Sequence, residues 1–169
     1  MMMNYKIGLF CCDIYNTYYY KLENHNDERN KFINNLQKII KKDNLKELLF
    51  SFITNDNSEF LNEFIEDIKY HLPDNIKLVE QFFYGGFILE DNNNIFYYSN
   101  KEDAIKYLDN KYKPIKIYYA DDVVYNHNLD NIIHFIPGNN KDNCYCSNSK
   151  GLNGLNESIE KYLEKISII

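Results

Sequence analysis

The amino-acid sequence predicts an α/β fold with a doubly wound, mainly parallel β-sheet. Short apolar runs of strand length alternate along the chain with longer segments whose apolar residues recur at helical spacing. Such alternation is typical of strand–helix–strand units with right-handed crossovers, which place helices on both faces of a sheet in three layers. The 169 residues, 44% of them hydrophobic, suffice for one core. We therefore expect a single domain over residues 1–169.

The first half of the chain contains two predicted strand–helix units. Residues 6–12 and 48–54 are apolar runs of the kind found in strands that are buried on both faces. The first run precedes a helical stripe that comprises Phe32, Ile33, Leu36, Ile39 and Ile40. The second precedes Ser58, a residue type that caps helices, and a stripe that comprises Phe60, Leu61, Phe64, Ile65 and Ile68.

The middle of the chain favours more β-structure and a third helix. Residues 76–83 indicate one strand, and residues 86–89 and 95–98 flank a polar turn, as in a small β-hairpin insertion. Ser99 and Glu102 have the spacing of a capping box, which predicts a helix start.

Two strands and a helix complete the predicted fold. Residues 115–120 and 132–136 are short apolar runs, as expected of buried strands. A last helical stripe comprises Leu155, Ile159, Leu163 and Ile166.

Charge and cysteine usage exclude several classes of function. A net charge of −6 argues against nucleic-acid binding, which needs a basic face, and favours metal-bound anions or basic partners. The apolar run at 7–12 is too short for a membrane span or a signal peptide, so we expect a cytoplasmic protein that does not enter a membrane. The cysteines and histidines lack the spacing of a zinc site or a disulfide framework: Cys11, Cys12, Cys144, Cys146, His25, His71, His127 and His134.

Polar residues follow three of the predicted strands directly. Asp13 follows the first, Thr54 the second, and Asp121 with Asp122 the strand at 115–120, while Lys101 opens the preceding helix. In open parallel sheets, ligands bind beyond the carboxyl ends of the strands. These residues are therefore the candidates for a functional site.

In this order, the segments resemble the four motifs of the haloacid-dehalogenase (HAD) superfamily of hydrolases. Residues 9–17 (LFCCDIYNT) resemble its first motif, an apolar strand followed by Asp-x-Asp-x-Thr. Residues 52–54 (FIT) resemble the second motif, Lys101 the third, and residues 118–126 (YYADDVVYN) the fourth. The resemblance covers about residues 6 to 136 and implies a HAD-like, Rossmannoid fold.

The resemblance also implies roles for these residues. Asp13 would be the nucleophile that attacks phosphorus, Thr54 and Lys101 would hold the transferring group, and Asp13, Asp121 and Asp122 would bind Mg²⁺. Mg²⁺ prefers oxygen ligands, commonly one or two carboxylates plus substrate phosphate. We further expect Lys101 to offset the clustered carboxylates and keep Asp13 ionised.

Tyr15 departs from the phosphatase pattern. It stands where family phosphatases carry the second aspartate, a general acid and base whose contribution is typically about 10²–10⁴-fold in rate. The family's 2-haloacid dehalogenases also carry tyrosine there, but followed by glycine, whereas this chain has Asn16. About 35 residues separate the first motif from the second strand, so no large cap domain fits, and the site is expected to be capless or minimally capped.

Structural interpretations stand beside these roles. Asp13, Thr54 and the Asp121–Asp122 pair are also typical of ordinary turns and acidic loops, and Lys101 competes with Lys113 and Lys116 for the third motif. Most of the sixteen tyrosines suit strands and core edges, although Tyr15 and residues 18–20 would also make a protein-binding face.

Three functions follow from these patterns. The first is a Mg²⁺-dependent phosphatase-type hydrolase acting on a phosphorylated substrate, impaired or specialised by Tyr15. The second is a catalytically silent binding module, for example an immunity protein that neutralises a basic protein toxin by charge complementarity. The third is a 2-haloacid dehalogenase, which the open site disfavours because that reaction needs a closed, dry pocket. Neither the substrate nor the oligomeric state follows from the residues.

Overall fold

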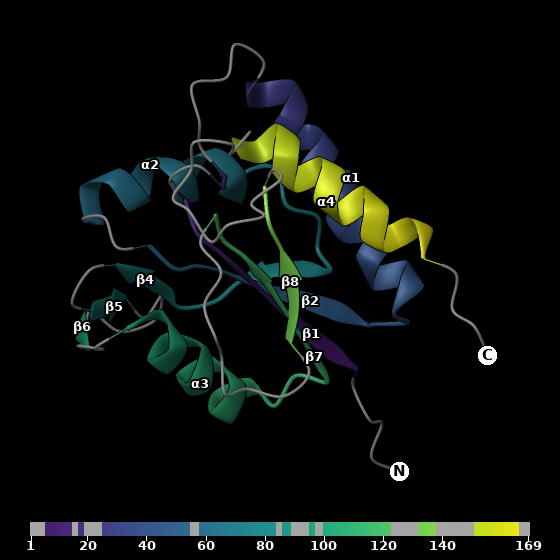
Figure 1. Cartoon of the computed structure of the whole chain (residues 1–169). Coiled ribbons are helices and arrows are strands. Elements are labelled where there is room, and N and C mark those ends of the chain that lie inside the picture. Colours follow the sequence, from purple (N-terminus) through teal and green to yellow (C-terminus); the bar gives the residue numbers. More distant parts are fainter. Residues whose placement is uncertain are drawn as a thin grey trace.

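The chain forms an α/β, Rossmann-like arrangement around one parallel sheet (Figure 1). The computed structural model describes residues 6–14, 17–18, 25–54, 58–83, 86–88, 95–96, 100–122, 132–137 and 151–165. Five parallel strands pair in the order β3-β2-β1-β7-β8. Their bounds are β1 Ile7–Cys12, β2 Glu47–Phe52, β3 Ile76–Leu78, β7 Lys116–Ala120 and β8 Ile132–Phe135. The predicted α/β class and mainly parallel sheet are confirmed.

Helices cover both faces of the sheet because successive residues of a strand point to opposite sides. The helices are α1 (His25–Lys42), α2 (Ser58–Lys69), α3 (Lys101–Tyr112) and α4 (Gly151–Glu164). Phe10 and Cys12 of β1 pack in the cluster with α1, α2 and α4, whereas Leu9 and Cys11 pack in the cluster with α3. Both faces of β1 are therefore dry, as its apolar sequence predicts.

The helix α4 closes the larger core and is held to α1 by buried amides. Leu152, Leu155 and Ile159 of α4 are fully buried in the cluster that contains Phe10. The Asn35 side chain donates to Asn156 Oδ1 (3.2 Å), and Asn156 donates in turn to the carbonyl oxygen of Glu28 (3.0 Å). Buried amides with partners of this kind fix one relative placement of two helices, because any other placement leaves polar groups unpaired.

The single strand predicted at 76–83 is wrong, because the segment divides into β3 and β4 (Gln81–Phe83). Ser51 Oγ donates to the carbonyl oxygen of Glu80 (2.6 Å), and the Gln81 side chain accepts from the backbone NH of Phe52 (2.6 Å). The Gln81 side chain thus accepts the hydrogen bond that the backbone of a neighbouring strand would otherwise accept. The chain continues beside the end of β2, where Phe82 forms a parallel bridge with Ile53. There β4 pairs in a three-stranded antiparallel sheet with β5 (Gly86–Ile88) and β6 (Ile95–Phe96), which includes the predicted hairpin.

The predicted capping box also needs correction. Asn100, not Ser99, is the N-cap of α3, and its side chain accepts from the backbone NH of Asp103 (2.9 Å). Ser99 lies outside the described residues, as does Ile166 of the predicted last stripe. The other predicted helices and strands are present, with bounds shifted by a few residues. Ser58, expected to cap α2, is its first residue.

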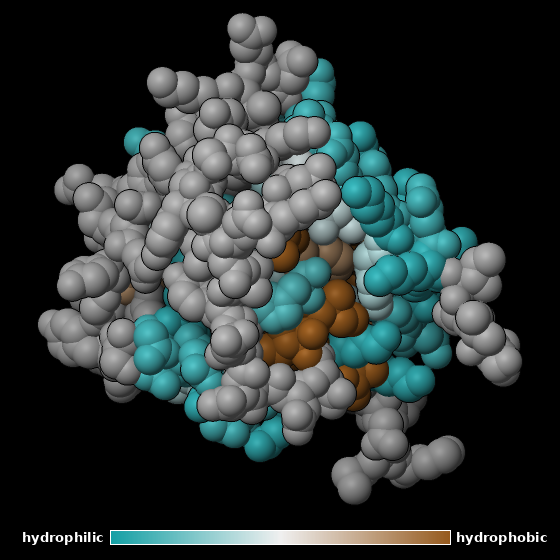
Figure 2. All heavy atoms as spheres, in the orientation of Figure 1, coloured by the Kyte–Doolittle hydropathy of each residue, from teal (hydrophilic) through white to brown (hydrophobic). Residues whose placement is uncertain are grey.

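The strand β8 forms one edge of the main sheet and is partly exposed. Ile132 and Ile133 have intermediate exposure. Figure 2 shows apolar surface near the middle of the face seen in Figure 1, where β8 lies.

None of the helices that the structure describes combines the length and apolar composition that a membrane span requires.

Candidate functional site

Two acidic segments meet at the carboxyl edge of the sheet. Cys12 at the end of β1 pairs with Ala120 at the end of β7, so Asp13 and Asp121 follow paired positions on neighbouring strands. The backbone NH of Asp13 donates to the carbonyl oxygen of Ala120 (2.8 Å), which continues the ladder by one residue. Chain order also reverses at β1, with β2 on one side and β7 on the other. Such switch points are where open α/β sheets bind ligands.

The carboxylates form a compact group around a lysine. Asp13, Asp121 and Asp122 each present an oxygen, and these oxygens lie within 4.8 Å of one another. Lys101 Nζ is 3.0 Å from Asp13 Oδ1 and 2.9 Å from Asp121 Oδ2, so it bridges the two strands from the first residue of α3. All four side chains are buried. Among the residues that the structure describes, these three carboxylates form the group that could hold a metal ion.

Tyr119 belongs to the same group, although the sequence was interpreted without it. Its hydroxyl donates to Asp121 Oδ2, the oxygen that also accepts from Lys101. Residues two apart on a strand point to the same side, so Tyr119 and Asp121 both face α3. That periodicity could have identified Tyr119 from the sequence. In the turn after β1, Thr17 Oγ1 lies 3.5 Å from Asp13 Oδ2, at the limit of a hydrogen bond.

The environment of Asp13 differs from the expectation that Lys101 keeps it ionised. Burial raises the pKa of Asp13, and the neighbouring charge of Asp121 raises it further. Lys101 lowers this pKa through its charge and its hydrogen bond, yet the net direction is well above the ordinary value. Burial weakens ionisation here more than one lysine restores it. The protein's own groups therefore weaken the ionisation of Asp13 and raise its pKa.

Thr54 and Tyr15 have different outcomes. Thr54 is fully buried at the end of the β2 segment, and its backbone NH donates to the carbonyl oxygen of Phe82 in β4 (3.0 Å). Because Ile53 NH donates to the Cys12 carbonyl oxygen (2.9 Å), Thr54 lies at the same edge of the sheet as Asp13. Tyr15 lies outside the described residues.

The structure distinguishes Lys101 from its two competitors. Lys113 is the C-cap of α3 in the left-handed conformation, at the far end of that helix. Lys116 begins β7 and its Nζ is 3.1 Å from Asp43 Oδ1, at the amino edge of the sheet. Lys101 is therefore the lysine of the three that reaches the carboxylates.

Three tyrosines are fully buried core residues. Tyr118 and Tyr119 are buried as expected of the strand predicted at 115–120, whereas Tyr18 is also buried, so the alternative of a protein-binding face that includes it is wrong for Tyr18. The Tyr18 hydroxyl donates to Asp67 of α2 (2.8 Å), and its ring packs against Phe52. The remaining residues of that face, Tyr19 and Tyr20, lie outside the described residues.

Asp67 of α2 forms hydrogen bonds with three residues. His25 Nε2 lies 2.9 Å from its Oδ2, and Arg29, the one arginine of the sequence, bonds to its Oδ1 from a buried position on α1. Burial raises the pKa of Asp67, but hydrogen bonds from His25, Tyr18 and Arg29 outweigh that effect and lower it to about 2. This carboxylate ties the turn after Asp13 to α1 and α2.

A different carboxylate group lies at the amino edge. Asp43 follows α1 and accepts from Tyr118 OH, from Tyr162 OH (2.7 Å) and from Lys116. Burial raises its pKa, but the hydrogen bonds from Tyr118, Tyr162 and Lys116 outweigh this and lower it.

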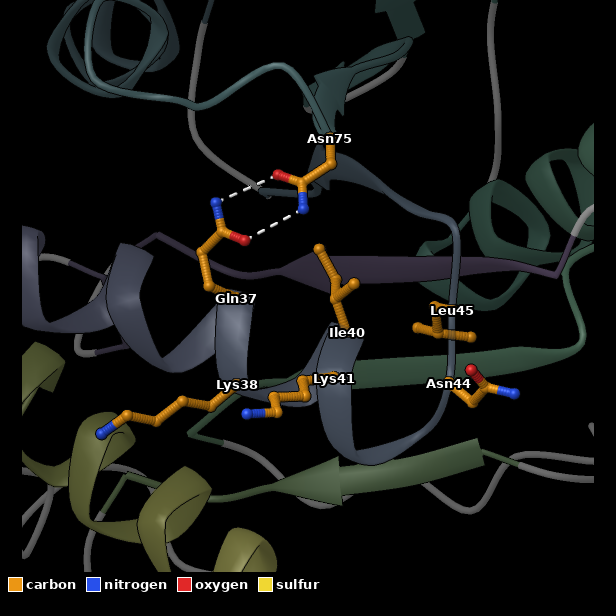
Figure 3. A pocket seen from close by; sticks show the side chains of 7 residues that line it. All are labelled: Gln37, Lys38, Ile40, Lys41, Asn44, Leu45 and Asn75. Carbon is orange, nitrogen blue, oxygen red and sulfur yellow. Dashed lines mark hydrogen bonds between the residues drawn. The ribbon is translucent and has the colours of Figure 1, made fainter.

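A surface pocket of about 480 Å³ opens near this amino edge (Figure 3). Leu45, just before β2, and Asn75, just before β3, line it together with residues at the end of α1. Gln37 and Asn75 close one side by exchanging two amide hydrogen bonds of 3.0 and 2.9 Å. The pocket and the Asp13 group therefore lie at opposite edges of the sheet.

Cys11 and Cys12 are free, buried thiols whose pKa values burial raises, as expected of small core residues. Cys144, Cys146 and His127 lie outside the described residues.

No family model matches the chain, and neither the curated proteins nor the solved structures contain a significant match.

Proposed function

We propose that the chain is a Mg²⁺-dependent hydrolase of phosphatase type with Asp13 as nucleophile, on a HAD-like, doubly wound fold with a minimal cap. The observation that supports this most is the convergence of Asp13, Asp121, Asp122 and Lys101 at the switch point of the sheet. Residues that lie more than a hundred positions apart meet there, in the order and at the strand ends that the resemblance implies.

The donor set fits Mg²⁺. Asp13, Asp121 and Asp122 offer hard oxygen atoms from buried positions, and three carboxylates with one lysine carry a formal charge of −2 when ionised. A divalent cation balances that charge. When bound, Mg²⁺ would neutralise charge on the transferring phosphoryl group.

The chain's own residues would divide the reaction between them. A carboxylate oxygen of Asp13 would attack phosphorus, and Lys101, 3.0 Å from Oδ1, would hold the side chain in place. The new bond would join that oxygen to phosphorus, the bond from phosphorus to the leaving oxygen would break, and the leaving oxygen would take a proton from water. Water then cleaves the aspartyl phosphate and regenerates the carboxylate. Lys101 and Thr54 would orient the phosphoryl oxygens, since positioning and charge neutralisation dominate phosphoryl transfer.

The second candidate is the binding module without turnover. It is favoured by Tyr15, which stands where the phosphatases of the resembled family carry the general acid. Its partner would be a basic protein that meets the acidic chain, such as a toxin.

Hydrolysis of p-nitrophenyl phosphate with and without Mg²⁺ tests the proposal. We expect Mg²⁺-dependent turnover in the wild-type chain and a loss on the order of 10³-fold or more in Asp13→Asn, because the nucleophile is removed. Asp27→Asn, an exposed substitution in α1, is the matched control and should keep full activity. Equal activity in Asp13→Asn rejects the assignment, and inactivity of all three proteins favours the binding module.

A further inference from the structure

Two consecutive tyrosines of β7 form hydrogen bonds with two different aspartates. Tyr118 and Tyr119 are consecutive, fully buried, and point to opposite faces of the sheet. Tyr118 OH donates to Asp43 at the amino edge, and Tyr119 OH donates to Asp121 at the carboxyl edge. The bond from Tyr119 lies inside the proposed cation site. A donor on a carboxylate there reduces the number of oxygen atoms that can bind a cation.

The Tyr119 bond falls on an oxygen that is already occupied. Asp121 Oδ2 accepts from Lys101 Nζ at 2.9 Å and from Tyr119 OH. Two donors on one carboxylate oxygen use its lone pairs, and a cation on the same oxygen would also be pressed against the lysine ammonium. Asp121 is therefore restricted to its other oxygen as a direct ligand.

Lys101 also occupies one oxygen of Asp13, Oδ1, at 3.0 Å, while Thr17 Oγ1 lies 3.5 Å from Oδ2, at the limit of a hydrogen bond. Two of the three carboxylates are thus arranged to give a cation one oxygen each. Divalent cations differ in their response to this restriction. Mg²⁺ takes single oxygens in an octahedron at about 2.1 Å, whereas Ca²⁺ takes about six to eight oxygens and often both oxygens of one carboxylate.

We propose that Tyr119 determines the cation selectivity of this site, by preventing Asp121 from chelating a cation with both oxygens and so disfavouring Ca²⁺ relative to Mg²⁺. The inference rests on the cation site of the proposed function, but not on turnover. Tyr119 acts through Asp121, so it is a positioning residue.

Isothermal titration calorimetry with MgCl₂ and with CaCl₂ on the full chain tests this inference. In Tyr119→Phe, Asp121 Oδ2 loses one donor, so the affinity for Ca²⁺ should rise relative to that for Mg²⁺ by about tenfold, the size expected for one hydrogen bond to a carboxylate. The matched control is Tyr118→Phe, which removes the hydroxyl of an equally buried tyrosine and its bond to Asp43 at the other edge, and should leave the ratio unchanged.

The outcomes separate the inference from the proposed function. A ratio that stays constant in Tyr119→Phe, or that changes equally in Tyr118→Phe, overturns the inference. Absence of binding of either cation to the wild-type chain overturns both the inference and the Mg²⁺ site. A changed ratio in a protein without phosphatase activity supports the inference and rejects the hydrolase. If Tyr119→Phe does not fold, Tyr119→Met removes the same donor with a flexible apolar side chain, and the same criteria apply.

Discussion

The aspartates at the two edges of the sheet have similar neighbours and opposite properties. Asp43 and Asp13 each lie beside a lysine, and a tyrosine of β7 belongs to each group. Despite burial, the pKa of Asp43 is lowered, because hydrogen bonds from two tyrosines and Lys116 act on one carboxylate. The pKa of Asp13 is raised by burial and by Asp121, because several carboxylates share Lys101.

The two groups differ in whether the protein supplies enough hydrogen-bond donors and positive charge to stabilise the ionised carboxylate. At Asp43, the protein supplies enough donors to hold the charged form, as a structural cross-link requires. At Asp13, the protein's own groups leave a surplus of negative charge, as a cation-binding site requires. Substitutions of the two lysines should therefore respond differently to Mg²⁺.

The largest effect is expected for Lys101→Met. Lys101 is 7% exposed between two carboxylates, so its removal leaves buried negative charges and should lower the free energy of unfolding by roughly 3 kcal/mol. Lys116→Met is the matched change at Asp43, but Lys116 is 38% exposed and should cost less than about 1 kcal/mol. Urea denaturation of both variants measures these losses.

The Mg²⁺ dependence of these two variants sharpens the comparison. Added Mg²⁺ should stabilise Lys101→Met more than the wild type, since the cation replaces a lost positive charge, and should not restore Lys116→Met. Equal stabilisation of both variants by Mg²⁺, or a larger loss in Lys116→Met, would contradict the distinction between the two edges.

A smaller effect is expected at Asp67. Like Asp43, this carboxylate has enough donors from the protein to stabilise its charged form, and one of them, Tyr18, lies in the turn after Asp13. Its pKa in the folded chain is about 2, below the ordinary 3.8, so its contribution to stability is present above pH 3.8 and is lost as the pH falls toward 2. The difference corresponds to about 2 kcal/mol. In urea denaturation, Asp67→Asn should lose about this amount at pH 7 and progressively less at pH 4 and pH 3. A loss that does not depend on pH would indicate a packing effect instead.

An effect smaller than those of Lys101→Met and Asp67→Asn is expected for Tyr162→Phe. This change removes one donor of 2.7 Å from Asp43 and keeps the ring that packs against Phe135. Because Tyr118 and Lys116 still hold the carboxylate, the loss should be about 1 kcal/mol in thermal or urea unfolding. A loss as large as that of Lys101→Met would show that the Asp43 group depends on each donor and is not redundant.

The position of the candidate site follows from strand patterns that the sequence displays. Asp13 and Asp121 end buried runs, and parallel strands bring such ends to one edge. The same logic selects Lys101, since a crossover helix starts at the carboxyl edge of the sheet and ends at the amino edge. Lys113 and Lys116 follow that helix, so the ambiguity among the three lysines could have been resolved without coordinates.

Other features of the structure depend on side-chain interactions that the surrounding sequence pattern does not predict. Gln81 supplies a partner to the backbone NH of Phe52, and nothing in an apolar run predicts that one strand then becomes two. The choice of Asn100 over Ser99 as helix cap is a difference of one position between equally suitable residues. The environment of Asp13 also needed coordinates, because its pKa reflects burial as well as nearby charges.

The dependence of the larger core on α4 has a consequence for synthesis of the protein. Phe10 of β1 and Phe135 of β8 share their cluster with Leu152 and Leu155, which are translated well after both strands. A nascent chain that has emerged only as far as β8 therefore still exposes part of an aromatic face to solvent or to chaperones. We expect folding to complete only after α4 leaves the ribosomal exit tunnel, so a chain stalled before residue 151 should be a preferred substrate for proteases.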